Sequence, residues 1–189
     1  MRFLKNFNRL TPPTLFDNER RHVLDTRKLM QLSHYITPQE IIIPLKGTTK
    51  DAIYKELVRH IVAQNHLKDK DKLVKAIQDR EASASTFLPM GIAIPHARIS
   101  NIKDIIMAMG VTQLPIKDTI KDSPPMSVNV FCMFFSPTEE KEFGRHLKLL
   151  ARIAAIFSDT KLVPELVKMK SPDDIFERIQ RRERELSEE

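Results

Sequence analysis

Six histidines are the side chains best suited to chemistry near neutral pH, and their spacing disfavours a metal site. They are His22, His34, His60, His66, His96 and His146. A zinc site on a helix commonly uses two histidines three or four positions apart, whereas His60 and His66 are six apart. The single cysteine lies inside an apolar run and offers no second thiolate. We therefore expect neither a metal nor any other cofactor.

His96 differs from the other histidines in its setting. It follows Gly91-Ile92-Ala93-Ile94-Pro95, a short apolar segment that predicts a strand ended by proline, which has no amide hydrogen for a ladder. We expect His96 just beyond the carboxyl end of that strand, where ligand sites in α/β sheets commonly lie. A neutral imidazole is a competent nucleophile toward phosphorus when its other nitrogen is held by a hydrogen bond.

Two further side chains could bind the oxygens of a phosphoryl group. Arg80 is predicted at the end of a helix and could donate two parallel hydrogen bonds, with Glu81 beside it. The hydroxyls of Ser85 and Thr86 could add donors. His146 begins the apolar face of a later helix, where an imidazole and the helix dipole both favour an anion. Phosphoryl transfer depends mainly on such positive groups and on positioning.

The elements that must position these residues alternate between strand and helix. Helical periodicity covers 50–65, 70–81 and 140–157, a shorter helix restarts near residue 159, and Ser171-Pro172-Asp173-Asp174 is a typical helix start. Apolar, β-branched runs predict strands at 41–45, 91–95, 105–112 and 128–135. Strands interleaved with helices indicate an α/β domain.

Composition limits the class of protein. Apolar residues make up 41% and charged residues 30%, which is typical of a globular chain. The net charge of +6 is dispersed and lacks interleaved aromatics, so we expect no nucleic-acid partner. No run approaches the roughly 20 apolar residues of a membrane span, and no secretory signal is apparent. We expect a cytoplasmic protein without stable membrane insertion.

Three regions are predicted along the chain. Residues 1–34 form an N-terminal extension in which Phe3, Leu4, Phe7 and Leu10 have helical spacing before Pro12 and Pro13 interrupt it. Such a basic amphipathic turn could contact a membrane or a partner, and otherwise it is a loosely packed extension. Residues 35–182 form the domain, and 183–189 form a frayed tail.

The motifs around the candidate residues resemble the fructose/mannitol/nitrogen-regulatory enzyme IIA family of the bacterial sugar phosphotransferase system. Arg80-Glu81, Ser85-Thr86 and Gly91–His96 are similar to the active-site signature of that family. The segment from His146 resembles its second-histidine helix, and Ser171–Phe176 resembles its closing helix. The resemblance extends from about residue 38 to residue 181.

The resemblance implies a fold, a set of roles and partners. The implied fold is a single domain with a mixed, roughly five-stranded sheet flanked by helices on both sides. His96 would be the phosphorylated histidine, His146 the second active-site histidine and Arg80 the site arginine. The donor would be the phosphocarrier HPr or a similar protein, and the acceptor an enzyme IIB domain or a regulatory target. The nitrogen-regulatory subgroup, which acts by binding targets, is the nearest likeness.

Two positions depart from the family pattern. Phe87-Leu88-Pro89-Met90 stands where the family often has glycines, and Ala97 stands where glycine commonly follows the histidine. A glycine there lets the backbone approach a phosphate closely. We expect these changes to affect donor preference or transfer, with Phe87, Leu88 and Met90 extending an apolar docking surface.

Three functions remain open at this point. The first is a phosphotransferase component with a phospho-His96 intermediate. The second is a regulatory binding module whose contacts with targets depend, or do not depend, on phosphorylation. The third is a structural partner of a transporter, which the presence of both His96 and Arg80 disfavours.

Overall fold

The computed structural model describes residues 30–118 and 126–188. The helices are α1 (Lys50–Gln64), α2 (Lys70–Ser83), α3 (Phe143–Ile156), α4 (Leu162–Lys168) and α5 (Pro172–Glu188), with short 3₁₀ turns η3 (Leu32–His34), η4 (Pro38–Glu40) and η5 (Glu140–Glu142). The strands are β1 (Ile41–Ile42), β2 (Phe87–Leu88), β3 (Ile92–Ala93), β4 (His96–Ile99), β5 (Ile106–Asp118) and β6 (Met126–Pro137).

The strands form one mixed sheet in the order β1-β5-β6-β3-β2, with β4 also pairing with β6. The long strands β5 and β6 are antiparallel, while β3 and β4 both run parallel to β6. The predicted mixed α/β fold is therefore confirmed. The described residues contain six strands rather than roughly five, because Phe87–Leu88 and His96–Ile99 form short strands of their own.

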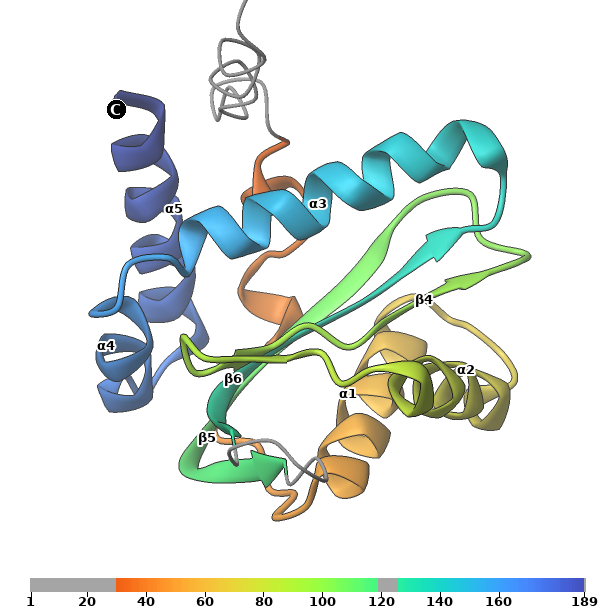
Figure 1. Cartoon of the computed structure of the whole chain (residues 1–189), viewed down its shortest axis with the longest axis horizontal. Helices are drawn as coiled ribbons and strands as arrows, with labels where there is room; N and C mark the ends of the chain where they lie inside the picture. The colour runs from red at the N-terminus through yellow and green to blue at the C-terminus, as the bar shows by residue number, and fades with distance from the viewer. Residues whose placement is uncertain (1–29, 119–125, 189) are drawn as a thin grey trace, which may run out of the picture.

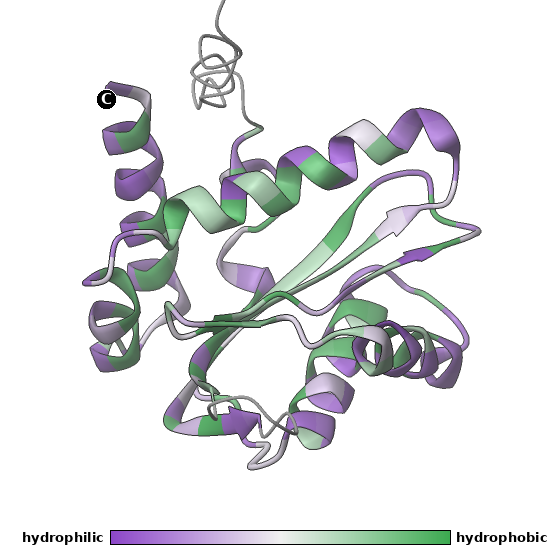
Figure 2. Ribbon diagram, in the orientation of Figure 1, coloured by the Kyte–Doolittle hydropathy of each residue, from purple (hydrophilic) through white to green (hydrophobic). Residues whose placement is uncertain are grey.

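Helices cover both faces of the sheet, as predicted. In Figure 1, α1 and α2 lie on one side of β5 and β6, and α3, α4 and α5 lie on the other. Alternate residues of β6 supply both layers: Cys132 and Phe134 pack toward α3–α5, whereas Phe131 and Met133 pack toward α1 and α2. This alternation follows from the two-residue period of a strand. Figure 2 shows hydrophobic residues concentrated along the central strands and hydrophilic residues on outer helix turns.

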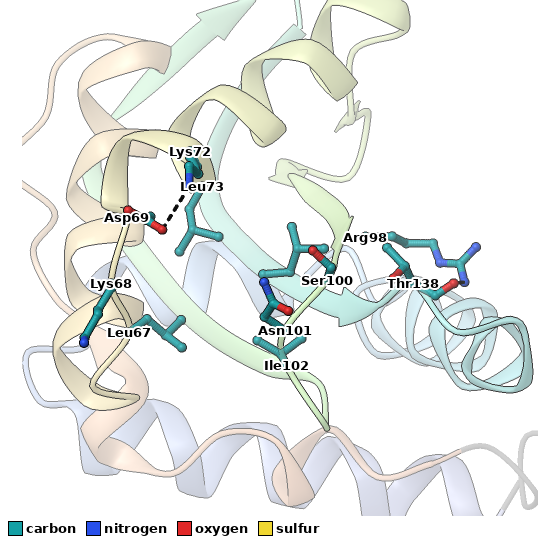
Figure 3. A pocket seen from close by; sticks show the side chains of 11 residues that line it. Leu67, Lys68, Asp69, Lys72, Leu73, Arg98, Ser100, Asn101, Ile102 and Thr138 are labelled. Atoms are coloured by element: carbon teal, nitrogen blue, oxygen red, sulfur yellow. Dashed lines mark hydrogen bonds and ion pairs between the residues drawn. The ribbon is translucent and has the colours of Figure 1, made fainter.

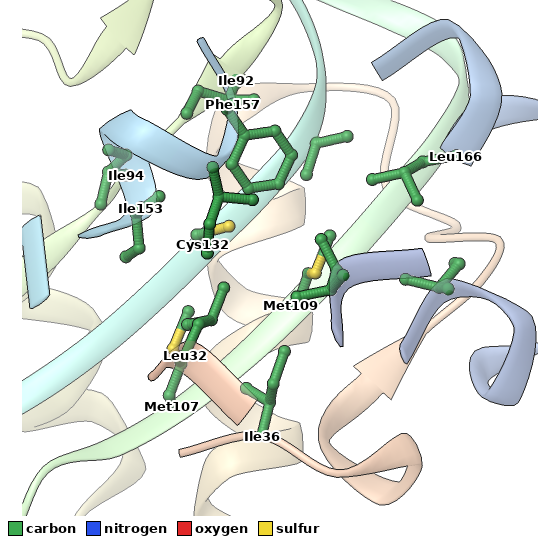
Figure 4. Close-up of a cluster of buried hydrophobic side chains, with 14 of the residues drawn as sticks. Leu32, Ile36, Ile92, Ile94, Met107, Met109, Cys132, Ile153, Phe157 and Leu166 are labelled. Carbon is green, nitrogen blue, oxygen red and sulfur yellow. The ribbon is translucent and has the colours of Figure 1, made fainter. Parts of the chain in front are cut away.

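The larger apolar layer surrounds Cys132. Figure 4 shows this side chain among Ile92 of β3, Met109 of β5, and Ile153 and Phe157 at the end of α3. Complete burial raises the pKa of the Cys132 thiol to about 12. The thiol therefore stays protonated and contributes as a small apolar group.

Short polar side chains cap two of the helices, and the cap at Ser171 confirms the helix start predicted there. The Thr49 hydroxyl accepts a hydrogen bond from the Ala52 amide at the start of α1. The Ser171 hydroxyl accepts one from the Asp174 amide at the start of α5, where Pro172 has no N–H that needs an acceptor. Short polar side chains thus satisfy amides that have no partner inside their helices.

His96 does not lie beyond a strand end, which differs from the prediction. The strand broken by Pro95 resumes at once, and β4 begins with His96 opposite Phe134 of β6. The Pro95 carbonyl still accepts from the Phe134 amide, so only the missing proline amide interrupts the ladder. His96 therefore lies within a single strand that is interrupted at Pro95 and runs alongside β6.

Phe87 does not extend a docking surface, contrary to the expectation. Its ring is buried and meets Phe131 edge to face at 5.8 Å, and Leu88 and Met90 pack partly buried against the opposite apolar layer. Phe87 and Leu88 form β2, antiparallel to β3, and Gly91 makes the turn with a positive φ of 86°. The segment therefore contributes to strand pairing and to the apolar layers rather than to an exposed docking surface.

The packed unit extends past the boundaries predicted at residues 35 and 183. Leu32 is fully buried, and α5 continues to Glu188 with Glu183 and Leu186 buried. One Glu183 carboxylate oxygen accepts from the Leu32 amide at 2.6 Å and from the Arg152 Nε at 3.1 Å. These contacts tie the chain near residue 32 to α3 and α5. Residues 1–29 of the predicted extension lie outside the described part.

Candidate functional site

A pocket of about 360 Å³ brings together three of the predicted site residues. Arg80 comes from α2, His96 and Arg98 from β4, and His146 from α3. Among the described residues β4 pairs only with β6, so its other edge is free. Because β4 lies at the sheet edge, side chains from the α2 layer and the α3 layer can meet around it.

The His96 ring is held by the strand that carries it. Its Nδ1 lies 2.7 Å from the carbonyl oxygen of Ile94. A carbonyl oxygen only accepts hydrogen bonds, so Nδ1 carries the proton and Nε2 keeps its lone pair. The ring stacks on Phe134 with a centroid distance of 5.4 Å, and the residue as a whole is 8% exposed. His96 thus presents an oriented, unprotonated Nε2.

His146 is oriented by a serine that sequence reasoning missed. The Ser136 hydroxyl lies 2.7 Å from His146 Nδ1, and Ser136 is fully buried at the end of β6. The His146 ring lies 5.1 Å from the His96 ring, centroid to centroid, and stacks on Phe143. Ser136 precedes a proline at a strand end, and this was the only local signal that could have singled it out.

The environment keeps both imidazoles neutral. Burial is the main cause that lowers the pKa of His96, Arg80 lowers it further, and the Ile94 carbonyl acts in the opposite direction. Burial is the main cause that lowers the pKa of His146 to about 4, followed by repulsion from His96 in its protonated form and from the guanidinium groups of Arg98 and Arg80. Two neutral rings beside two guanidinium groups make a site that favours an incoming anion.

Arg98 is the second site residue that the sequence analysis missed. Its guanidinium donates to the carbonyl oxygens of Pro137, Thr138 and Glu139, at 3.3, 2.7 and 3.0 Å, and lies over the Phe143 ring at 5.1 Å. These bonds join β4 to the segment that leads into α3. A useful signal was available: Arg98 is two positions after His96 and so shares its face of the strand.

The remaining predicted residues form a separate polar network. Glu81 is buried and accepts from Tyr54 and Thr86, and Lys50 lies 2.9 Å from it. The Ser85 hydroxyl donates to Asp118, which also pairs with Lys50. Neither hydroxyl lines the histidine pocket. The network instead fixes the chain between α2 and β2.

Arg80 and Ala97 complete the wall of the pocket. Nη1 of Arg80 donates to the Ala84 carbonyl at 2.9 Å, which leaves further guanidinium donors for a ligand. Ala97 lines the pocket but its methyl belongs to the apolar layer of α1 and α2. Its side chain is thus accommodated away from the His96 face.

The described residues also bear on metal binding and on membrane insertion. Across 30–118 and 126–188, no three His, Cys, Asp or Glu side chains converge as a metal ion requires. Within the same ranges, no helix combines the length and apolar character needed to cross a bilayer.

The low pKa of His146 predicts that stability falls in mild acid. In the unfolded chain a histidine titrates near 6.5, whereas folded His146 titrates near 4. Between these values the unfolded state binds a proton that the folded state does not, so the free energy of unfolding decreases as the pH falls. Urea unfolding at pH 7 and pH 5, with NMR titration of the ring, measures both quantities.

His146→Gln is the matched variant for this prediction, because it removes the titrating group and retains an amide near Ser136. The variant is expected to lose part of the pH dependence between pH 7 and pH 5. A ring that titrates near 6.5 in the folded protein would contradict the prediction.

The chain belongs to the family described as phosphoenolpyruvate-dependent sugar phosphotransferase system, EIIA 2, whose model matches residues 34–182. Members of this family are phosphotransfer components. The mannitol-specific phosphotransferase enzyme IIA component of Staphylococcus aureus is 33% identical over 106 residues, which cover 56% of this chain and 68% of that protein. A nitrogen regulatory protein of Pseudomonas aeruginosa is 25% identical over 68% of this chain and 80% of its own length.

The fructose-specific EIIABC component of Bacillus subtilis is 24% identical over 78% of this chain, but the match spans only 23% of that longer protein. Among solved structures, the nitrogen regulatory protein IIA-Ntr from Neisseria meningitidis aligns with a TM-score of 0.68 at 21% identity, covering 78% of this chain and 97% of that one. The mannitol IIA of Escherichia coli aligns with a TM-score of 0.62 at 16% identity, covering 76% and 98%. Both structures share the fold described above.

Proposed function

We propose that this protein is a phosphocarrier in which Nε2 of His96 accepts a phosphoryl group from an HPr-like protein. The observation that carries the proposal is the His96 ring itself: Nδ1 bonds to the Ile94 carbonyl at 2.7 Å, and the ring lines an anion-favouring pocket. Membership of the EIIA family supports a phosphotransfer role in general. The particular donor and the roles of the individual residues are part of the proposal.

The transfer follows from the geometry of the pocket. The lone pair of Nε2 forms a bond to phosphorus as the bond from phosphorus to the donor breaks. The ring gains positive character during the step, and the Ile94 carbonyl stabilises it through the Nδ1 proton. Arg80 and Arg98 offset the charge on the equatorial oxygens. Transfer onward reverses these changes, with an enzyme IIB domain or another target protein as acceptor.

The direct test is intact-mass spectrometry of the purified chain mixed with phosphoenolpyruvate, enzyme I and HPr. We expect one added phosphoryl group that is lost in acid, as a phosphorus–nitrogen bond should be. A chain that gains no mass with HPr or with a nitrogen-branch donor would overturn the proposal.

Replacing Arg80 with glutamine is expected to slow phosphoryl acceptance by about 10- to 100-fold. A hydrogen bond to a charged group contributes about 1.5–3 kcal/mol, and each 1.4 kcal/mol corresponds to about tenfold in rate. Rapid-quench measurement of phosphorylation gives the rate. Lys75→Gln, on the same helix but outside the pocket and paired with Asp79, is the control and should retain the wild-type rate. Equal rates for the two variants would contradict the role of Arg80.

A regulatory binding function is the second candidate, and the match to nitrogen regulatory proteins favours it. In this case phosphorylation of His96 would change which proteins the pocket face binds. Phe143 and Leu147 are exposed on α3 next to His146 and could contact such a target. Affinity capture with the phosphorylated and unphosphorylated chain tests this function. Identical sets of partners would argue against phosphorylation-dependent regulation.

A further inference from the structure

A second cleft, of about 540 Å³, shares Arg98 with the histidine pocket. It is formed by the α1–α2 connection and the first turn of α2 on one side, and by β4 and its following turn on the other. In Figure 3, Leu67 and Leu73 face the side that carries Ser100, Asn101 and Ile102. Its volume falls within the range of roughly 300–1,000 Å³ that is typical of small-molecule sites.

The walls of the cleft are aliphatic on both sides. Leu67 and Leu73 come from the helical side, and Ile99 and Ile102 come from the strand side. Leu73 is buried, while Leu67, Ile99 and Ile102 are partly exposed. Two facing aliphatic walls suit a flat ring, which buries both of its faces when it lies between them.

The polar groups around the cleft are available for a ligand. Within the described residues, the hydroxyls of Ser100 and Thr138 and the side-chain amide of Asn101 make no hydrogen bond to the protein. Asn101 lies in the turn that follows β4, where its φ is positive at 68°. An amide that both donates and accepts can pair with the edge of a heterocycle.

The charge at the rim favours an anion. Three cationic residues line the cleft, Lys68, Lys72 and Arg98, against one carboxylate, Asp69. Asp69 is already paired with Lys72 at 3.1 Å, whereas Lys68 has no ion pair among the described residues. Lysine is an effective point-charge partner of a phosphate group.

We infer that this cleft binds a nucleotide, with the base between the aliphatic walls and the phosphate at Lys68. Arg98 lines both this cleft and the histidine pocket. Arg98 donates hydrogen bonds to the Thr138 and Glu139 carbonyls. These two residues belong to the segment that leads into α3, the helix that carries His146. A bound nucleotide therefore also changes the surroundings of the His146 ring.

The test is isothermal titration calorimetry of the unphosphorylated chain with AMP, GMP, adenosine, ribose 5-phosphate and inorganic phosphate. At least one nucleotide is expected to bind at least tenfold more tightly than each of the three partial ligands. Amide NMR shifts should then map to residues 67–73 and 98–102. Because no phosphoryl transfer is measured, the result is independent of the function proposed for His96.

Two variants and one control locate the site. Lys68→Gln and Asn101→Gly are each expected to weaken binding at least fivefold, and glycine tolerates the positive φ of position 101. Lys75→Gln, an exposed lysine of α2 outside the cleft, should bind like the wild type. Absence of nucleotide binding overturns the inference, as does equal binding of inorganic phosphate or an equal loss in the Lys75 control.

Discussion

Replacement of His96 by alanine is expected to abolish acid-labile phosphorylation of this chain. His96 is the only ring in the pocket whose Nδ1 is bonded to a backbone carbonyl among the described residues, which leaves Nε2 as the nucleophile. The neighbouring His146 has its Nδ1 at the Ser136 hydroxyl, and we expect it to assist rather than accept. Intact-mass spectrometry after incubation with phosphoenolpyruvate, enzyme I and HPr gives the phosphorylated fraction.

Two controls separate chemistry from folding in that experiment. His60→Ala removes a partly buried histidine of α1, outside the pocket, whose Nε2 contacts the Gln39 carbonyl at 2.7 Å, and it should be phosphorylated like the wild type. His96→Gln retains an amide that can donate to Ile94 and should fold while remaining unphosphorylated. A phosphorylated His96→Ala chain would show that another residue is the acceptor.

The largest expected effect on stability comes from Glu183, whose replacement by glutamine should lower the free energy of unfolding by about 3–5 kcal/mol. Its carboxylate pairs with the guanidinium of Arg152, and both side chains are almost completely buried. Removing one partner of a buried ion pair leaves the other charge uncompensated, and losses of about this size follow. Urea unfolding followed by circular dichroism measures the change.

Glu185→Gln is the matched control, because Glu185 is on the same helix and its pairs with Arg178 and Arg182 are partly exposed. Its loss should stay below about 1 kcal/mol. Hydrogen exchange at the Leu32 amide provides a second readout, since that amide donates to Glu183 and should exchange faster in Glu183→Gln. A Glu183→Gln chain as stable as the control would show that the pair contributes little.

The ion pair between Arg152 and Glu183 also connects both ends of the described chain to the helix that carries His146. Arg152 lies on α3, six residues after His146, and the Glu183 carboxylate also accepts from the Leu32 and Ser33 amides. The helix that carries the second histidine is therefore braced by residues from both ends of the described chain. Glu183, which lies in the predicted tail 183–189, is therefore part of the support of the site.

Local sequence determined much of this protein. The periodicity of 50–65 and 70–81, together with the helix start at Ser171, predicted helices at their observed places. These features depend on interactions within one or two turns, which a sequence displays directly. The motif around His96 and its resemblance to the EIIA family predicted the fold, which the matches to known proteins confirm. It also indicated His96, Arg80 and His146, which the structure places around one pocket.

Tertiary structure alone decided which groups meet across long separations. Three hydrogen bonds illustrate this, and they join segments 10 to 151 residues apart. They link Ser136 to His146, Arg98 to the Thr138 carbonyl before α3, and Glu183 to the Leu32 amide. No periodicity reveals such partners, because they depend on how the strands pair and which helix faces cover them. For the same reason Phe87, apolar in any context, is a core residue here: the pairing of β2 with β3 turns its ring toward Phe131.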